Sequence, residues 1–232
     1  MVPFSVASRD SSSSVPVRRT VSVVIPQHNR LELTERAVSS LLRWHPAGVE
    51  VVIVDDGSSE RGTFGRLRTL SGNVTLIQSN RRQGVTAAWN LGAKVATGAI
   101  LIFLNNDTVS LGEWIGRLCG PLEYAGCLMT GCGWRTEREW SAGAGRFLPG
   151  WCLAIKRSDF LGFGGFDERF RMYFSDTDLQ VRIRLDHPNG LMAVDGLSLR
   201  HLGHASTAGL VTRKSEWRRD RLLFRRKWRR GE

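Results

Sequence analysis

Two apolar runs decide the fold class of this chain: residues 21–25 (VSVVI), which stop at Pro26, and residues 51–54 (VVIV), which lead into the turn DDGS at residues 55–58. Between them, residues 31–44 place apolar side chains on one face at helical spacing. A buried strand, an amphipathic helix and a second buried strand predict a βαβ unit.

The same alternation continues to about residue 110. Further strands are predicted over residues 74–77 and 100–104, and helices over residues 61–70 and 86–96, the last with Thr86 or a neighbour as its cap. Near-continuous β-branched strands that alternate with helices predict an α/β fold, with a mostly parallel central sheet and helices on both of its faces.

The second half of the chain is less regular. We expect helices over residues 111–124 and 176–185, strands over residues 151–155 and 191–194, and a loop or irregular ribbon over residues 135–150. Three tryptophans near that loop are predicted either to stack on a bound ligand or to pack in the core. They are Trp134, Trp140 and Trp151.

The domain organisation is predicted to be a flexible lead-in over residues 1–19, one α/β domain over residues 20–207, and a basic amphipathic helix over residues 208–232. The chain carries 33 Lys and Arg against 22 Asp and Glu, a net charge of +11, and residues 213–232 alone carry ten and three, which is +7. The helix would bind an anionic membrane surface, bind nucleic acid, or pack its apolar stripe onto the domain. That stripe is Leu210, Trp217, Phe224 and Trp228.

Composition limits the protein class. With 41% hydrophobic and 24% charged residues the chain is globular rather than disordered. Its apolar runs are shorter than the about 18 residues of a membrane span, and its first residues do not resemble a secretory signal. We therefore expect a cytoplasmic protein, with the inner face of the cell membrane as an alternative location because of the basic tail. The four cysteines are predicted to be buried thiols: Cys119, Cys127, Cys132 and Cys152.

Polar clusters follow three of the predicted strands: PQHN at residues 26–29, DDGS at residues 55–58 and NND at residues 105–107. Ligands of open α/β sheets bind at the carboxyl ends of the strands, where these clusters would meet. They fit a nucleotide site with a divalent cation, although each cluster alone is also an ordinary turn. Because the chain has neither G-x-G-x-x-G after its first strand nor a P-loop, side chains and a metal would hold the phosphates.

Six motifs in chain order resemble those of the family-2 glycosyltransferases with the GT-A fold, including rhamnosyltransferase-like enzymes and enzymes of cell-wall or polysaccharide synthesis. They are VSVVIPQHNR at 21–30, VIVDDGS at 52–58, NRRQGVTAAWN at 80–90, LNNDT at 104–108, GGFDE at 164–168 and FSDTDL at 174–179. His201 and Ser206 match a late histidine–serine pattern. The resemblance implies a GT-A fold and an inverting transfer of a sugar from a nucleoside-diphosphate sugar to an acceptor hydroxyl, in the synthesis of a cell-surface glycan or glycolipid.

The resemblance also implies roles for individual residues. Asp176 matches the catalytic base, and Asp107 and His201 match the positions that hold Mn²⁺ or Mg²⁺, with His204 as the alternative histidine. The donor-binding positions would be Pro26, His28, Asn29, Asp55, Asp56, Asn80, Gly84, Asn90, Asn105 and Asn106. The acceptor-binding positions would be Asp178, Trp151, Gly165 and Phe166.

Three departures from the family pattern bear on the function. His28 stands where a tyrosine is usual, Ser175 replaces a glutamate, and Asn105 and Asn106 leave Asp107 as the one charged group of the metal motif. Since the residues that match the catalytic base and a metal ligand, Asp176 and Asp107, are both present, we expect an active enzyme.

Several alternatives stay open at this stage. The acceptor could be a glycan, a lipid-linked molecule or a small natural product, and the protein could be a nucleotide-sugar binding module without turnover. Nucleic-acid binding is less well supported, because no recognition motif accompanies the charge. Among the residues, Asp176 could merely cap a helix, His201 could be a surface histidine, and Asp178 could support Asp176 or be solvated.

Overall fold

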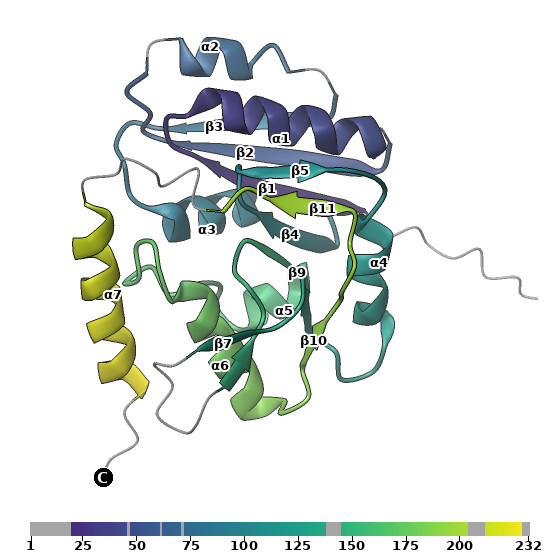
Figure 1. The fold of residues 1–232 in the computed structure, drawn as a ribbon, viewed down its shortest axis with the longest axis vertical. Coiled ribbons are helices and arrows are strands. Elements are labelled where there is room, and N and C mark those ends of the chain that lie inside the picture. Colours follow the sequence, from purple (N-terminus) through teal and green to yellow (C-terminus); the bar gives the residue numbers. More distant parts are fainter. Residues whose placement is uncertain are drawn as a thin grey trace, which may run out of the picture.

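A seven-stranded sheet in the order β10-β6-β9-β4-β1-β2-β3 organises the fold in the computed structural model, which describes residues 20–45, 47–60, 62–70, 72–137, 145–203 and 212–228 (Figure 1). The neighbouring strands are parallel, except that β9 runs antiparallel to both β4 and β6. The strands are β1 Val21–Gln27, β2 Val49–Asp56, β3 Val74–Ser79, β4 Ile100–Leu104, β6 Met129–Gly131, β9 Cys152–Lys156 and β10 Leu191–Ala193.

Helices cover both faces of this sheet, as predicted. On one face, α1 (Leu31–Trp44), α2 (Thr63–Leu67) and α4 (Ile115–Cys119) pack on side chains such as Val23 and Ile53. On the other face, α3 (Val85–Val95), α5 (Arg157–Gly162) and α6 (Ser175–Asp186) pack on the alternate residues of the same strands. Strand alternation thus supplies two cores, and each fully buried valine, leucine or isoleucine stabilises the fold by about 1.5–3 kcal/mol.

Two small antiparallel pairs complete the architecture. β5 (Thr108–Ser110) pairs with β11 (Leu199–His201), and β7 (Arg135–Glu137) pairs with β8 (Gly145–Phe147). The first pair returns the chain from residue 199 to the carboxyl end of β4, where the polar cluster at residues 105–107 lies.

The C-terminal helix α7 (Arg213–Trp228) lies along the side of the domain, next to the region of α6 (Figure 1). Phe224 is fully buried in a third apolar cluster with Phe147, Phe170, Phe174 and Val181. The face of α7 that packs on the domain also buries Glu216 and Asp220, whereas Trp217 of the same helix is 39% exposed. The helix therefore packs on the domain through a face on which the predicted apolar residues Phe224 and Trp228 lie beside buried carboxylates; Leu210 lies outside the described residues.

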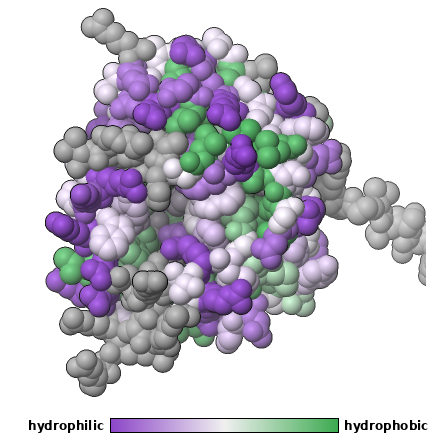
Figure 2. All heavy atoms as spheres, in the orientation of Figure 1, coloured by the Kyte–Doolittle hydropathy of each residue, from purple (hydrophilic) through white to green (hydrophobic). Residues whose placement is uncertain are grey.

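The outer face of α7 is hydrophilic, as Figure 2 shows along the left edge of the molecule. Lys214, Arg218, Arg225 and Arg226 are exposed there, with Leu222 as an exposed apolar side chain. Within the described ranges, no helix combines the length and the apolar character that crossing a membrane requires.

The predicted elements are confirmed with two exceptions. Residues 111–124 do not form one helix: α4 covers Ile115–Cys119 and a 3-10 turn, η1, follows at Gly120–Glu123, because Pro121 lacks an N–H and favours a turn start. Helix α3 begins after Gly84 and has no side-chain cap, so the prediction that Thr86 or a neighbouring side chain caps it is wrong. Thr86 is buried instead. Three of the cysteines are buried, and Cys132 is half-buried.

Candidate active site

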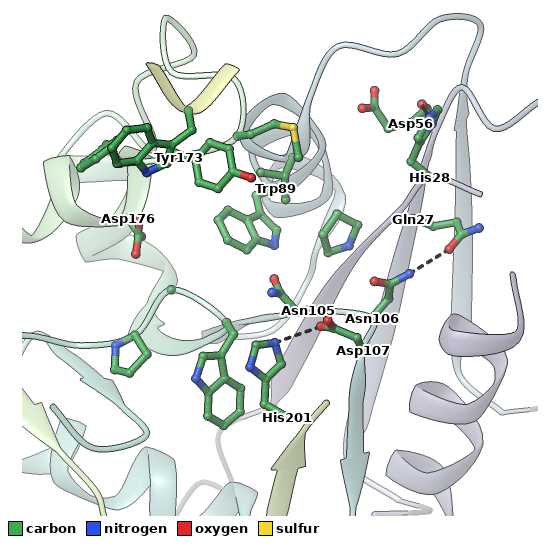
Figure 3. Close-up of a pocket in the computed structure, with 18 of the residues that line it drawn as sticks. Gln27, His28, Asp56, Trp89, Asn105, Asn106, Asp107, Tyr173, Asp176 and His201 are labelled. Atoms are coloured by element: carbon green, nitrogen blue, oxygen red, sulfur yellow. Dashed lines mark hydrogen bonds and ion pairs between the residues drawn. The ribbon is translucent and has the colours of Figure 1, made fainter. Parts of the chain in front are cut away.

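A pocket of about 340 Å³ opens where β1, β2 and β4 end, on the side of the domain that α7 borders. One wall comes from the strand ends and the opposite wall comes from the segment before α6 and from α7. Figure 3 shows its side chains. The pocket is lined by Pro26, Gln27, His28, Asp56, Arg82, Val85, Trp89, Asn105, Asn106, Asp107, Arg135, Pro149, Gly150, Trp151, Met172, Tyr173, Phe174, Asp176, His201 and Trp217.

At one end of the pocket, His28 and Asp56 lie together (Figure 3). The Nδ1 atom of His28 is 2.9 Å from the backbone oxygen of Asp56. Because a carbonyl oxygen can only accept a hydrogen bond, Nδ1 carries a proton, and in the neutral form of such a ring Nε2 is an acceptor.

The carboxylate of Asp56 closes a loop onto this end of the pocket. Its two oxygens accept hydrogen bonds from the backbone N–H groups of Gln83 and Gly84, at 2.6 and 2.7 Å. Gln83 and Gly84 directly precede α3, so the carboxylate of Asp56 links the end of β2 to the start of α3. The residue that was predicted to contact the donor therefore also shapes the wall around it.

In the middle of the pocket, Asp107 and His201 form a pair. The Oδ1 atom of Asp107 is 3.0 Å from Nε2 of His201, and the Asp107 side chain is 1% exposed. The ring of His201 stacks on Trp151, with 4.8 Å between ring centroids and 5° between planes. This packing fixes the imidazole in one orientation, and the surface-histidine interpretation of His201 is wrong because it lines the pocket.

The pair fits part of a divalent-metal site. A carboxylate oxygen and an imidazole nitrogen are ligands that Mn²⁺ accepts, and Mg²⁺ is held by one or two carboxylates together with substrate phosphates. No cluster of three or more metal-binding side chains occurs in the described part of the chain. Oxygens of a bound diphosphate and water would therefore have to complete the coordination.

Asp176 lies at the other end of the pocket from His28 and Asp56, in the first turn of α6 (Figure 3). Its Oδ2 atom accepts a hydrogen bond from Nη2 of Arg135 at 3.0 Å, and the same guanidinium donates to Oγ1 of Thr177 at 2.7 Å. The N-cap residue of α6 is Phe174, without a side-chain cap. The described hydrogen bonds of the Asp176 carboxylate are thus those of a positioned pocket residue rather than of a helix cap.

Three predicted acceptor residues are corrected by their placement. Asp178 is fully buried and is bonded to Arg182, Lys227 and Trp228, so it is neither solvated nor able to touch an acceptor. Phe166 is 2% exposed and packs among the rings of the core that α3 covers.

Gly165 is the third of these. It is buried, its φ of 72° is one that glycine adopts without strain, and its carbonyl accepts a hydrogen bond from Arg182 at 2.7 Å. Of the predicted acceptor residues, Trp151 lines the pocket.

Five predicted donor residues do not line the pocket. Asp55 is fully buried and accepts from the backbone N–H of Ser58, and Asn29 accepts from the backbone N–H of Ser59. Asn90 is bonded to the backbone of Phe166 through both its oxygen and its nitrogen. These side chains satisfy turns beside the site, which is the ordinary role of Asp and Asn in loops.

Gly84 and Asn80 are the remaining two. Gly84 has a φ of 110°, and a Cβ there would lie 3.1 Å from the carbonyl carbon of Arg171 and closer still to its oxygen. The position therefore requires glycine for close packing of two loops. Asn80 is exposed after the end of β3.

Several pocket residues were not predicted from the sequence. They include Arg135 beside Asp176, Tyr173 before α6, and Trp217 of α7. Burial raises the pKa of Tyr173, so its hydroxyl stays protonated at neutral pH. Tyr173 could have been found from its position next to the FSDTDL motif; Arg135 and Trp217 stand in segments without a motif. His204, Ser206 and Trp140 lie outside the described residues.

Comparison with known proteins gives one family. Residues 22–178, more than half of the chain, match the family model "Glycosyl transferase family 2". The O-antigen biosynthesis protein RfbC of Myxococcus xanthus is 26% identical over 83% of this chain and 18% of its own length. An uncharacterized glycosyltransferase of Haemophilus influenzae is 28% identical over 70% of this chain and 61% of its own. The chain thus spans less than two thirds of the length of either relative.

Among solved structures, the mannosyltransferase PcManGT from Pyrobaculum calidifontis, in complex with GDP-Man and Mn²⁺, superposes with a TM-score of 0.66. The match has 20% sequence identity and covers 94% of this chain and 66% of that chain. At this identity the likeness establishes the fold, which is the predicted α/β fold of the GT-A glycosyltransferases.

Proposed function

This chain belongs to glycosyl transferase family 2, and we propose that it transfers a sugar from a nucleoside-diphosphate sugar to an acceptor hydroxyl with inversion at the anomeric carbon. The observation that carries the proposal is the order of groups in one pocket: His28 at one end, the Asp107–His201 pair in the middle, and Asp176 at the other end. The nucleobase of the donor, its diphosphate and the acceptor hydroxyl would need binding positions in this order.

The donor base would be one that carries a ring N–H. Since Nδ1 of His28 donates to the Asp56 carbonyl, its Nε2 is an acceptor that matches the imino N–H of uracil, thymine or guanine. Adenine and cytosine lack that donor. The GDP-Man bound by PcManGT belongs to the matching class.

The diphosphate would lie over Asp107 and His201. These two residues would hold Mn²⁺ or Mg²⁺, and the bound cation supplies positive charge that stabilises the leaving diphosphate. The stacking of His201 on Trp151 keeps the imidazole in place for this role. Arg135, which also lines the pocket, adds a fixed positive charge on the side of Asp176.

Asp176 is proposed as the general base. Its carboxylate takes the proton of the acceptor hydroxyl as that oxygen forms its bond to the anomeric carbon, and the bond from that carbon to the diphosphate oxygen breaks with its electron pair going to the diphosphate. One base suffices, because the leaving group needs charge neutralisation rather than a proton. The hydrogen bond from Arg135 to Oδ2 orients the carboxylate for this transfer.

The acceptor would enter between Trp151 and the aromatic side chains Tyr173 and Trp217. A second hollow of about 690 Å³ shares Tyr173 and Trp217 and is otherwise lined by Arg213, Lys214 and Arg218. Its cations favour an acceptor that carries negative charge, such as a lipid-linked or phosphate-bearing glycan at the inner face of the cell membrane. A role in cell-surface glycan synthesis is in line with the name of the M. xanthus relative.

The test uses a panel of UDP-, dTDP- and GDP-sugars with Mn²⁺, and follows release of the nucleoside diphosphate with water as acceptor. ¹H NMR of the first sugar released is expected to show the anomeric configuration opposite to that of the donor; retained configuration would contradict inversion. Asp176→Asn is expected to bind the donor as wild type does and to lower the rate of nucleoside-diphosphate release by about 100-fold or more. Donor binding by wild type with no release would favour a binding module without turnover.

A further inference from the structure

The helix α7 lies outside the residues that match the family model, yet it contacts the active-site wall directly. Several of its contacts fall on one short segment, residues 171–174, which joins the core to α6. This segment carries Tyr173 and Phe174 into the pocket and is followed at once by the turn that holds Asp176.

The strongest of these contacts is made by Asp220. Its side chain is fully buried, and Oδ2 accepts hydrogen bonds from three consecutive backbone N–H groups, those of Arg171, Met172 and Tyr173, at 3.1, 2.9 and 3.1 Å. Its other oxygen, Oδ1, accepts from Nη1 of Arg219 at 3.0 Å. Hydrogen bonds to an ionised carboxylate are stronger than neutral ones, and burial keeps water from competing for them.

The segment needs such a restraint because Phe174 is strained. Its φ is 66°, in the left-handed region, where a bulky residue costs of order 1–3 kcal/mol. The ring of Phe174 stacks on Phe224 of α7, with 5.1 Å between centroids. One residue of α7 thus holds the backbone before the strained position, and another holds its side chain.

The helix α7 also contacts Asp178, which follows Asp176 in the first turn of α6. Trp228 donates its Nε1–H to Oδ1 of Asp178 at 2.9 Å, and Nζ of Lys227 lies 2.7 Å from the same carboxylate. Asp176 is therefore flanked on both sides by residues that α7 restrains, while its own carboxylate faces the pocket.

We propose that Asp220 is a positioning residue of the active site, which orients Tyr173 and Asp176 toward the acceptor by fixing the backbone of residues 171–173. The proposal rests on the proposed function, in which Asp176 is the base. It assigns to α7 a role in turnover that is distinct from adding stability.

The first test needs only the wild-type protein. The amides of residues 171–173 are expected to exchange hydrogen as slowly as those in the centre of α6, because all three donate to a buried carboxylate. If they exchange as fast as the amides of an exposed loop, the contact does not form in solution and the proposal is overturned.

The second test compares Asp220→Asn and Asp220→Ala with Glu50→Gln. Glu50 is the control: its half-buried carboxylate accepts three hydrogen bonds, from Ser22 and from the backbone and hydroxyl of Thr97, where that of Asp220 accepts four. It lies at the start of β2, away from the pocket. All three variants are expected to lower the melting temperature. The Asp220 variants alone are expected to lower kcat for nucleoside-diphosphate release, by about 10- to 100-fold, with unchanged donor-induced stabilisation.

The results separate this proposal from the proposed function. If Asp176→Asn abolishes release while both Asp220 variants keep the kcat of Glu50→Gln within about twofold, Asp220 is only structural and the positioning role is wrong. If Asp176→Asn itself retains release, the assignment of the base is wrong. If the Asp220 variants do not fold, the exchange measurement on the wild-type protein decides.

Discussion

The carboxylate of Asp107 and the imidazole of His201 are 94 positions apart in the sequence, and their Oδ1 and Nε2 atoms lie 3.0 Å apart. The pairing of β5 with β11 explains this, because it places His201 opposite Thr108. The candidate metal site is therefore assembled by a strand pair that joins the end of the chain's first half to a late segment. It is complete only when both halves have folded.

Because Gly150 has no side chain, the side chain of Asp176 can occupy the space next to it. A Cβ at Gly150 would lie 2.6 Å from Cγ of Asp176 and 2.9 Å from its Cβ, which is too close for either to stay in place. We expect Gly150→Ala to lower the rate of nucleoside-diphosphate release by about tenfold or more, because a displaced base loses its alignment. Donor-induced stabilisation should persist, since His28 lies at the opposite end of the pocket.

The control for that variant is Gly116→Ala. Gly116 lies in α4, and a Cβ there would have no heavy atom within 4 Å, so alanine fits. Steady-state kinetics should then show wild-type turnover for Gly116→Ala and reduced turnover for Gly150→Ala. Equal turnover in the two variants would contradict the tight packing around Asp176.

His28 is expected to select the donor base. Isothermal titration should show binding of UDP and GDP and much weaker binding of ADP and CDP, because the ring nitrogen at the pocket accepts a hydrogen bond. His28→Ala should weaken UDP and GDP binding by about tenfold, the loss of one to two kcal/mol that a hydrogen bond contributes. Tight binding of ADP or CDP by the wild-type protein would exclude this role.

Asp167 makes stability depend on acid pH. Its hydrogen bonds with Arg169, and then with Lys227 of α7, hold the pKa of its carboxyl well below the usual range. A lowered pKa in the folded state contributes stability that is present above the unfolded-state value of about 3.9 and is lost as the pH falls below it. The free energy of unfolding of Asp167→Asn should therefore be lower than that of wild type at pH 7, with a gap that narrows below about pH 4.

Urea unfolding of the two proteins between pH 7 and pH 3 measures that gap. A constant difference over the whole range would mean that the ion pairs of Asp167 add no pH-dependent stability.

Local patterns predicted much of this fold, and the reason is physical. Helix α1 occupies the predicted residues 31–44, because its buried side chains, such as Leu31, Val38 and Leu41, recur at helical spacing. The strand β4 likewise coincides with its apolar run at Ile100–Leu104. Where one residue's neighbours in sequence decide its burial, the pattern is sufficient.

Residues whose partners are distant in sequence could not be assigned in the same way. Asp178 stands in a motif that implied contact with an acceptor, but Trp228, 50 positions away, and Lys227 enclose its carboxylate. Phe166 is similarly buried in the core, where its ring packs against those of Trp89 and Phe103. Nothing in the local sequence distinguishes such a residue from one at a pocket wall.

The candidate site divides in the same manner. Asp56 and Asp107 follow strand ends, where topology alone predicts a shared edge, and both line the pocket. Arg135 lies in β7, and Trp217 lies in α7, which contacts the domain through Asp220 and Phe224. Their roles, like that of Asp176, stay predictions until they are measured.

The most direct test of the account is thermal unfolding with UDP, dTDP, GDP, ADP and CDP, each with and without Mn²⁺, on the wild-type protein and on Asp107→Ala. Ligands that bind only the folded state raise the melting temperature by mass action. The account predicts a rise with UDP, dTDP or GDP that requires Mn²⁺ and is lost in Asp107→Ala. The absence of any rise in the wild-type protein, or an equal rise in Asp107→Ala, would contradict a metal-dependent donor site in this pocket.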